Sequence, residues 1–160
     1  MSIFVASTPA PEPKSPIVEK AALLLAGITI LLVLSQLFSF EKFPDVIQTL
    51  ALPGIGDGYA VLIAALVVVA EVLMVPFLLR MRLSPVMRMA SMVAGWLVVV
   101  WWIFVALWQN LLPTGQVGAA FLGATVPTPI GWWAVCLMLG VGVLTTWVSW
   151  GLWPLRRTVK

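Results

Sequence analysis

The stretch 59–79, YAVLIAALVVVAEVLMVPFLL, constrains the fold of this chain more than any other. It matches the roughly 20 apolar residues that an α-helix needs to cross a bilayer. Glu71 lies well inside it and is its only charged residue. An acid at that depth costs about 2.5–3.5 kcal/mol on insertion scales, so it normally faces the interior of a helix bundle and has a partner there. The stretch therefore predicts a transmembrane helix that carries a buried carboxyl group.

Composition extends this prediction to the whole chain. Of its 160 residues, 62% are hydrophobic and 9% are charged, and its mean hydropathy is +1.10. A soluble domain carries about 25% charged residues, so we expect a membrane protein with several crossings and lipid around it. With no His and a single Cys, Cys136, the chain also lacks an internal disulfide and the usual ligand sets for zinc, haem and iron–sulfur clusters. We expect no metal and no nucleic-acid partner, and the net charge of +3 is interpreted as a signal of membrane orientation.

Four apolar stretches predict an all-α fold, an integral membrane four-helix transmembrane bundle over 17–153. The spans are expected at about 17–40, 59–79, 87–112 and 130–152. The proline-rich segment 1–16 predicts a flexible tail, and 154–160 predicts a short basic tail. If the N-terminus is cytoplasmic, eight of the nine Lys and Arg residues fall inside and only Lys42 falls outside. This asymmetry predicts that both termini are cytoplasmic.

The two long connections have features of their own. After the first span, Phe43, Val46, Ile47 and Leu50 recur at helical spacing, which predicts a short amphipathic helix lying in the membrane interface. After the third span, the segment VGAAFLGA at 117–124 is apolar. It is expected either to enter the interface or to cover the mouth of the bundle.

Residues at the depth of Glu71 predict a polar layer inside the bundle. At a rise of 1.5 Å per residue, the same depth in the other three spans falls near residues that are small or form hydrogen bonds: Thr29, Trp96 with its neighbour Gly95, Thr145 and Thr146. Glu71 also shares a helical face with Ala60, Ala64, Val67, Val68 and Met74, which predicts that this face points inward.

Two roles are compatible with Glu71. A buried carboxyl group without a cation beside it keeps its proton, so it could carry protons or donate a hydrogen bond to a bound carbonyl group. Alternatively, it is a neutral acid that bonds Thr29 or a Trp N–H group and pins the helices together. The deep tryptophans Trp96, Trp101 and Trp102 also have two alternative roles. They stack on a quinone or pigment ring, or they simply pack against lipid or a neighbouring helix. Because Trp101 and Trp102 are adjacent, at most one of them lines a given pocket.

Two charged groups lie at the span ends. The first group is expected at the outer mouth and consists of Glu41, Lys42, Asp45 and Asp57. It either binds a small anion or a partner protein, or it is a solvated turn without a binding role. The second is expected at the inner end, where it marks topology and contacts lipid headgroups or a partner: Arg80, Arg82 and Arg88.

The order of these motifs resembles the DoxX-like superfamily of small four-helix membrane proteins, including its MauE-like branch. The likeness rests on SFEKFPDVIQTLALPG after the first span and AEVLMVPFLL in the second, and the matching positions are Lys42, Phe43, Leu50, Pro53 and Glu71. Such proteins are associated with membrane redox enzymes, either as quinone-linked subunits or as assembly partners. The resemblance therefore implies a protein of the bacterial inner membrane.

Two functions follow as hypotheses. The first is a non-catalytic accessory or assembly subunit that packs against a larger membrane complex, of the redox or electron-transfer kind that the resemblance implies. The second is a quinone-interacting oxidoreductase subunit in which Glu71 is an intramembrane proton relay. The second predicts a cavity that reaches Glu71 from the membrane and is lined by Thr29, Trp96 and Thr145 or Thr146.

Overall fold

The computed structural model describes residues 8–50, 57–111, 120–124 and 131–153. These residues form five α-helices: α1 (Pro16–Phe38), α2 (Phe43–Thr49), α3 (Asp57–Leu78), α4 (Pro85–Leu111) and α5 (Trp132–Leu152). Within this part of the chain, four helices (all but α2) are long and apolar enough to cross a membrane. The predicted fold class is confirmed, and the helix ends lie within two residues of the predicted span ends. The predicted basic tail at 154–160 lies outside the described residues.

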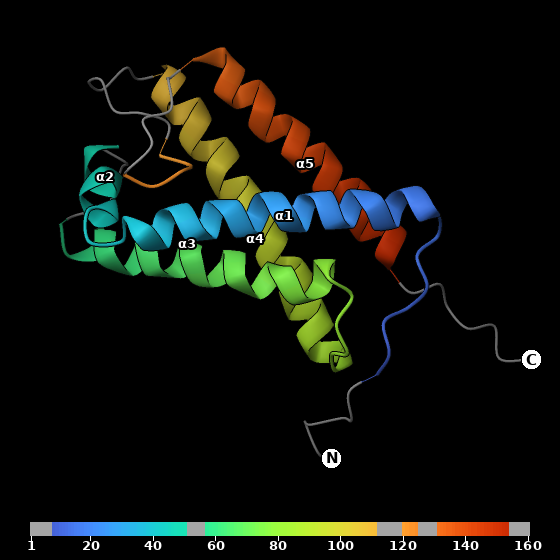
Figure 1. Cartoon of the computed structure of the whole chain (residues 1–160). Coiled ribbons are helices and arrows are strands. Elements are labelled where there is room, and N and C mark those ends of the chain that lie inside the picture. The colour runs from blue at the N-terminus through green and yellow to red at the C-terminus, as the bar shows by residue number, and fades with distance from the viewer. Residues whose placement is uncertain (1–7, 51–56, 112–119, 125–130, 154–160) are drawn as a thin grey trace, which may run out of the picture.

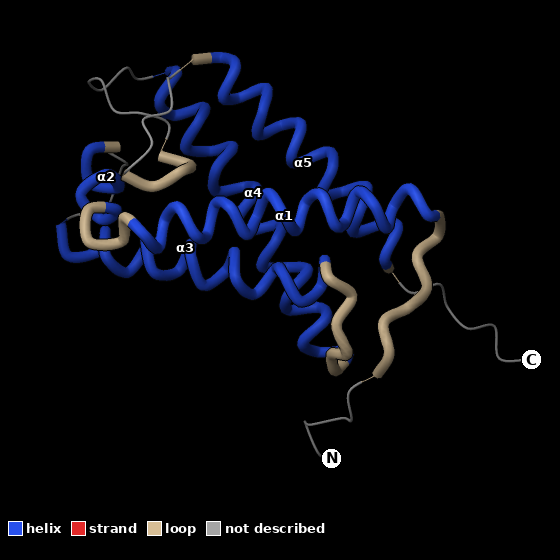
Figure 2. Tube along the Cα trace, viewed as in Figure 1, coloured by secondary structure: helices blue, strands red, loops and turns tan. Residues whose placement is uncertain are grey.

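The four long helices form a ring in which α1 packs on α3, α3 on α4, α4 on α5 and α5 on α1. Figures 1 and 2 show α1 and α3 running side by side while α4 and α5 cross them obliquely. The short helix α2 sits at one end of α1 and α3 and packs against α3. Hereafter this end is called the α2 end, and the opposite end, which carries the α3–α4 connection, is called the arginine end.

Local sequence signals set the helix boundaries. Ser15 caps α1, because its side chain accepts a hydrogen bond from Val18 N at 3.3 Å, and Pro16 supplies the φ angle preferred in a first turn. Arg80 follows α3 with a φ of +54°, a left-handed conformation that stops the helix. Ser84 precedes α4 and accepts from Met87 N at 3.2 Å. The α3–α4 connection is therefore a short, well-capped turn.

The face of α3 that carries Glu71 points into the bundle, as predicted. Ala60, Ala64, Val67, Val68 and Met74 are all buried there. The amphipathic face of α2 is confirmed as well. Its apolar residues Phe43, Ile47 and Leu50 are buried, and Phe43 and Ile47 belong to the same core cluster as Ala64. The connections thus add to the core instead of only joining the spans.

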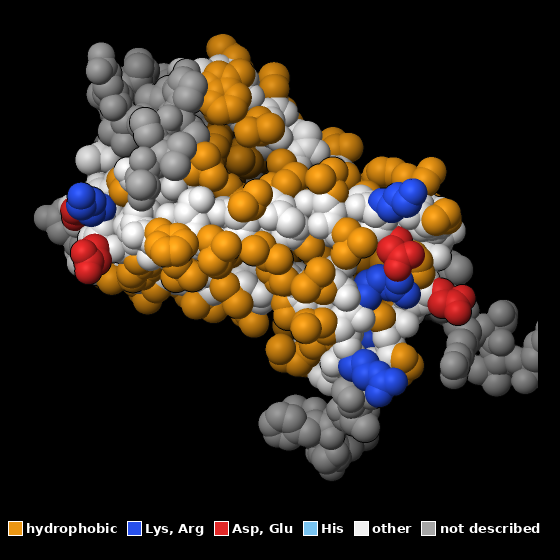
Figure 3. All heavy atoms as spheres, viewed as in Figure 1, with side chains coloured by type: hydrophobic (Ala, Val, Ile, Leu, Met, Phe, Trp, Pro, Cys, Tyr) orange, Lys and Arg blue, Asp and Glu red, His pale blue; other side chains and the backbone are white. Residues whose placement is uncertain are grey.

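The surface between the two ends is apolar. Large side chains such as Leu31 and Leu97 are more than 60% exposed in the middle of their helices. Figure 3 shows hydrophobic side chains along the length of the bundle on this face, with the acidic and basic side chains gathered at its two ends. This is the surface of a protein whose middle is covered by lipid, so the chain is a multi-pass membrane protein.

The N-terminal segment lies against the arginine end of the bundle. Residues 1–7 are not described, but residues 8–15, predicted to belong to a flexible tail, lie along the arginine end of the bundle. Thr8 N donates to Leu83 O at 3.2 Å, and Lys14 N donates to Gly151 O at 3.1 Å. Prolines give this segment no periodic apolar pattern, so its docking depends on backbone hydrogen bonds that the sequence does not reveal.

Candidate ligand site around Glu71

Glu71 is fully buried and is held by two uncharged donors. Trp102 Nε1, from α4, donates to Glu71 Oε1 at 2.9 Å, and Gln36 Nε2, from α1, donates to the same oxygen at 3.2 Å. The predicted bond to a tryptophan N–H is therefore present, whereas Thr29 donates elsewhere, to Leu25 O at 2.9 Å. Three of the four long helices meet at this carboxyl group.

The second oxygen of the carboxyl group, Glu71 Oε2, is buried and has no hydrogen-bond partner among the described residues. A neutral carboxylic acid has this distribution of partners: its carbonyl oxygen accepts two bonds and its hydroxyl oxygen keeps a hydrogen to donate. Because an unpaired polar atom in apolar surroundings costs about 1–3 kcal/mol, Oε2 is the atom of this site that a ligand would satisfy.

Glu71 borders a cavity of about 420 Å³ in the centre of the bundle, within the size range of small-molecule sites. All four long helices and the segment 120–124 contribute to its wall, and apart from Glu71, Thr29 and two tryptophans that wall is apolar. The cavity reaches the membrane-facing surface, because Trp133 and Leu137 of α5 line it and are 43% and 48% exposed.

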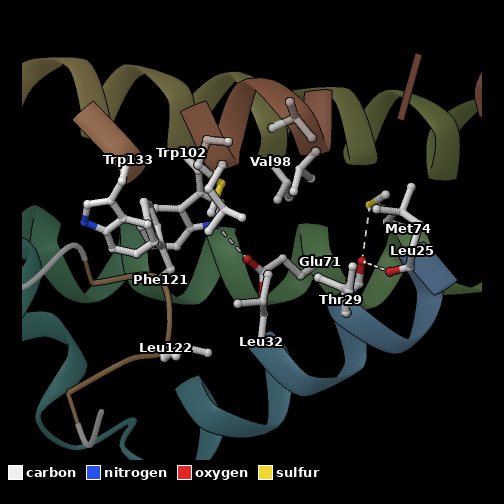
Figure 4. Close-up of a pocket in the computed structure, with 15 residues that line it drawn as sticks. Leu25, Thr29, Leu32, Glu71, Met74, Val98, Trp102, Phe121, Leu122 and Trp133 are labelled. Carbon is white, nitrogen blue, oxygen red and sulfur yellow. Dashed lines mark hydrogen bonds between the residues drawn. The ribbon is translucent and has the colours of Figure 1, made fainter. Parts of the chain in front are cut away.

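The two halves of the cavity differ. Figure 4 shows the rings of Trp102, Phe121 and Trp133 on one side of Glu71, and Thr29, Leu25 and Met74 on the other. Trp102 and Phe121 pack edge to face, with ring centroids 5.3 Å apart. A flat ring is complementary to the aromatic half, and a flexible hydrocarbon chain to the aliphatic half.

The segment 120–124 closes the cavity at the α2 end. Phe121 is buried in the core, and its backbone carbonyl accepts from Gln36 Nε2 at 3.1 Å. Ala124 N donates to Ser39 Oγ at 3.0 Å. Gly123, at a φ of +69°, packs so closely on α1 that a Cβ atom would collide with Ser39 Oγ. Residues 120–124 therefore cover the end of the bundle, which is one of the two placements predicted for this connection.

The predicted polar layer does not assemble as a unit. Thr29 and Glu71 border the same cavity, but Trp96 and Thr146 lie in a separate, shallow groove at the surface between α4 and α5, where Thr146 is exposed. Thr145 is buried, and its hydroxyl has no partner among the described residues. Equal depth was a poor guide because it ignores which way each residue faces around its helix.

Gln36 and Trp102 are the residues that the depth argument missed. Each lies about two turns beyond the residue expected at the level of Glu71 in its own helix. Side chains of a helix lean toward its N-terminus, and α3 runs antiparallel to both α1 and α4. Glu71 therefore leans toward the α2 end, while Gln36 and Trp102 lean toward the arginine end to meet it.

The adjacent tryptophans Trp101 and Trp102 line different pockets, as their spacing predicts. Trp101 lines a groove between α3 and α4 and not the Glu71 cavity, so only one of the adjacent pair faces this site. Cys136, the single cysteine of the chain, is exposed on α5.

Within the described residues, no group of three His, Cys, Asp or Glu side chains is placed to hold a metal ion.

The charged groups at the span ends lie apart from the cavity. At the α2 end, the side chains of Glu41, Lys42 and Asp45 are exposed. Asp57 is the first residue of α3. At the arginine end, Arg80 pairs with Glu19 at 2.6 Å, and Arg82 is exposed. Arg88 Nη2 donates to the backbone oxygens of Thr8, at 3.3 Å, and Pro9, at 3.1 Å. Arg80 Nη2 also donates to Pro11 O at 3.5 Å, so two of the three arginines contact the chain's own N-terminal segment.

Fold and site together define the class: a four-helix membrane bundle with a buried carboxyl group beside an apolar cavity. No protein-family model matches the chain, and no curated protein or solved structure matches it either.

Proposed function

We propose that the protein is a quinone-interacting subunit of the membrane, with Glu71 as its hydrogen-bonding and proton-relay group. The observation that carries this proposal is the free Oε2 atom of Glu71 beside an apolar cavity that reaches the membrane-facing surface. A membrane-soluble ring compound with a carbonyl group has the complementary chemistry. Its carbonyl oxygen accepts from Glu71, its ring stacks in the aromatic half, and its tail lies along the aliphatic half.

The relay role follows from the position of the proton. For this role the hydrogen on Oε2 has to lie within hydrogen-bond reach of a carbonyl oxygen bound in the cavity, the geometry required of a general acid. A partner enzyme supplies the electrons, and the relay role requires no redox group in the chain itself. The resemblance to DoxX-like proteins supports the same placement beside a quinone-linked enzyme.

We also propose which membrane holds the protein and how the protein is oriented in it. In the bacterial inner membrane, the arginine end faces the cytoplasm together with both termini, and the α2 end faces outward. The support is the distribution of basic residues, with Lys42 the only one assigned to the outer side. A cysteine introduced at Asp45, exposed at the α2 end, is expected to react with a membrane-impermeant maleimide in intact cells, and one at Lys20 is not. For this test Cys136 is first replaced by Ser.

A matched pair of variants tests ligand binding. Leu137→Trp fills the mouth of the cavity, whereas Leu139→Trp adds the same ring at an equally exposed position that does not line it. We expect Leu137→Trp to weaken the binding of a short-chain quinone at least about tenfold, as an overfilled site does. Leu139→Trp is expected to bind like the parent protein in calorimetric titration. Equal affinity in both variants would contradict a ligand site in this cavity.

A second candidate function, the non-catalytic accessory or assembly subunit, is favoured by a different observation. Gly140 lies on the exposed face of α5, one turn from Cys136, and nothing lies within 4 Å of the space that a side chain there would fill. Small residues on a lipid-facing helix allow another helix to come close. Gly140→Leu is then expected to abolish co-purification of a larger complex in mild detergent, while Gly27→Leu, at an open position of α1, is not.

A further inference from the structure

We infer that the Glu71 site selects the oxidised, carbonyl form of its ligand over the reduced, hydroxyl form, and that Gln36 and Trp102 set this selectivity. The inference rests on the proposed function, because it concerns the ligand of the same cavity. It goes further in assigning what chemical group the cavity accepts and what it rejects. It also gives two residues outside the acid a role in specificity.

The first step concerns Glu71 Oε1. A carboxyl oxygen has two lone pairs, and both are engaged here, one by Gln36 Nε2 at 3.2 Å and one by Trp102 Nε1 at 2.9 Å. A ligand hydroxyl group therefore finds no vacant acceptor at this oxygen. Both donors come from buried side chains on different helices, so the blocked geometry is built into the packing.

The second step concerns Glu71 Oε2. Neither partner of Glu71 carries a charge. The basic residue nearest to Glu71 in the sequence, Arg80, is paired with Glu19 at the arginine end. An unpaired carboxylate in an apolar cavity is strongly disfavoured, so the acid is neutral and Oε2 carries the hydrogen. Towards a ligand, the site is then a donor.

The third step compares the other polar groups of the wall. The Thr29 hydroxyl already donates to Leu25 O at 2.9 Å, and the Trp102 N–H is used by Glu71. A carbonyl oxygen in the cavity therefore receives the hydrogen of Glu71 Oε2. A hydroquinone hydroxyl beside Glu71 has to place its own hydrogen either on the weak acceptor lone pair of Oε2 or on the hydroxyl oxygen of Thr29, which lies on the aliphatic side of Glu71. A carboxylate headgroup, such as that of a fatty acid, would be desolvated without a cation.

Gln36 also links the selectivity to the cavity wall. Its amide group donates both to Glu71 Oε1 and, at 3.1 Å, to the carbonyl oxygen of Phe121, whose ring lines the aromatic half. Removing this amide frees one lone pair of Oε1 for a ligand hydroxyl. The discrimination between the two redox forms should then fall even when the carbonyl form still binds.

The experiment titrates the full-length protein in mild detergent with a decyl-chain benzoquinone and, under argon, with its chemically reduced hydroquinone. We expect the parent protein to bind the quinone about tenfold tighter or more, the discrimination that one unpaired buried hydrogen-bonding group produces. Glu71→Gln should keep this preference, because its amide can still accept with oxygen and donate with nitrogen. Glu71→Leu should lose most of the quinone affinity.

Gln36→Leu is expected to bring the two affinities to within about threefold of each other, because the freed lone pair accepts from the hydroquinone. If that variant is unstable, Trp102→Phe keeps the ring, removes the N–H and should act in the same direction. Thr29→Val is the control: it removes the other acceptor of the wall, so it should not lower the preference. Equal or tighter binding of the hydroquinone by the parent protein would overturn the inference but not the proposed function. Binding of neither form would overturn both.

Discussion

Helix α3 and the turn that follows it carry two polar centres, and these follow different physical rules. Glu71 is fully buried and bonded to neutral groups from α1 and α4, whereas Arg80, two residues after the helix end, is paired with Glu19 at a partly exposed site. Burial makes each bond of the Glu71 centre costly to lose, because a group left without its partner cannot turn to water. Exposure makes the Arg80 pair weak, because water and salt replace it.

The difference indicates how the two regions are used. At the Glu71 centre the chain builds a rigid, dry site with one atom left free for a ligand. At the arginine end it uses charge to hold its own N-terminal segment along the membrane surface, through Arg80 and Arg88. In the part of the chain that the structure describes, the cavity beside Glu71 has a volume of about 420 Å³, whereas the pocket beside Arg80 and Arg88 has only about 10 Å³.

The largest effect is expected for Trp102→Ala. It removes a ring that is 1% exposed, its edge-to-face contact with Phe121 and its bond to Glu71. We expect the free energy of unfolding, measured in mixed detergent and SDS micelles, to fall by about 3–5 kcal/mol. Trp101→Ala removes the same ring from the half-buried neighbouring position and should cost clearly less. Equal losses in the two variants would mean that the buried centre has no special weight in stability.

Gly123→Ala should have the next largest effect, because it disturbs the wall of the site without touching Glu71. The new methyl group would collide with Ser39 Oγ at a backbone conformation that favours glycine. A loss of about 1–3 kcal/mol is expected in the same unfolding assay. Gly140→Ala, at an open helical position, should be neutral or slightly stabilising. A neutral Gly123→Ala would show that the segment 120–124 is not tightly docked on α1.

Arg80→Ala is expected to have the smallest effect, because the side chains of Arg80 and Glu19 are 27% and 46% exposed. The loss should be below about 1 kcal/mol and should shrink further when the salt concentration rises from 0.05 to 0.5 M. Arg82→Ala, at a neighbouring exposed position, provides the control. If Arg80→Ala lowered the free energy of unfolding strongly and independently of salt, the Arg80–Glu19 pair would behave like the buried Glu71 centre, and the difference between the two regions would not hold.

Much of the fold could be predicted from hydropathy alone. An apolar stretch of about 20 residues has one stable conformation in lipid, so the four long helices and their approximate ends follow from the sequence. The inward face of α3 followed as well, because Glu71 and the small residues Ala60 and Ala64 mark it. The short helix α2 was visible in its spacing of apolar residues.

The composition of the site could not be predicted in the same way. Depth along the chain pointed to Thr29 and Trp96 as neighbours of Glu71, but its partners are Gln36 and Trp102. Hydrogen-bond partners are chosen by how side chains lean and by the rotation of each helix about its axis, and neither is encoded in hydropathy. The docking of Phe121 over the cavity joins residues 85 positions apart, which no local pattern reveals.

The sequence by itself determined that this protein has four apolar helices of membrane-spanning length, with a carboxyl group facing inward, because lipid leaves a chain of this composition no other stable arrangement. Only the tertiary structure decided that one oxygen of that carboxyl group is filled and the other is free, and that a cavity lies beside it. The physical reason is that antiparallel helices bring together side chains that lean toward one another, and that the packing of α4 and α5 across α1 and α3 sets which of them meet.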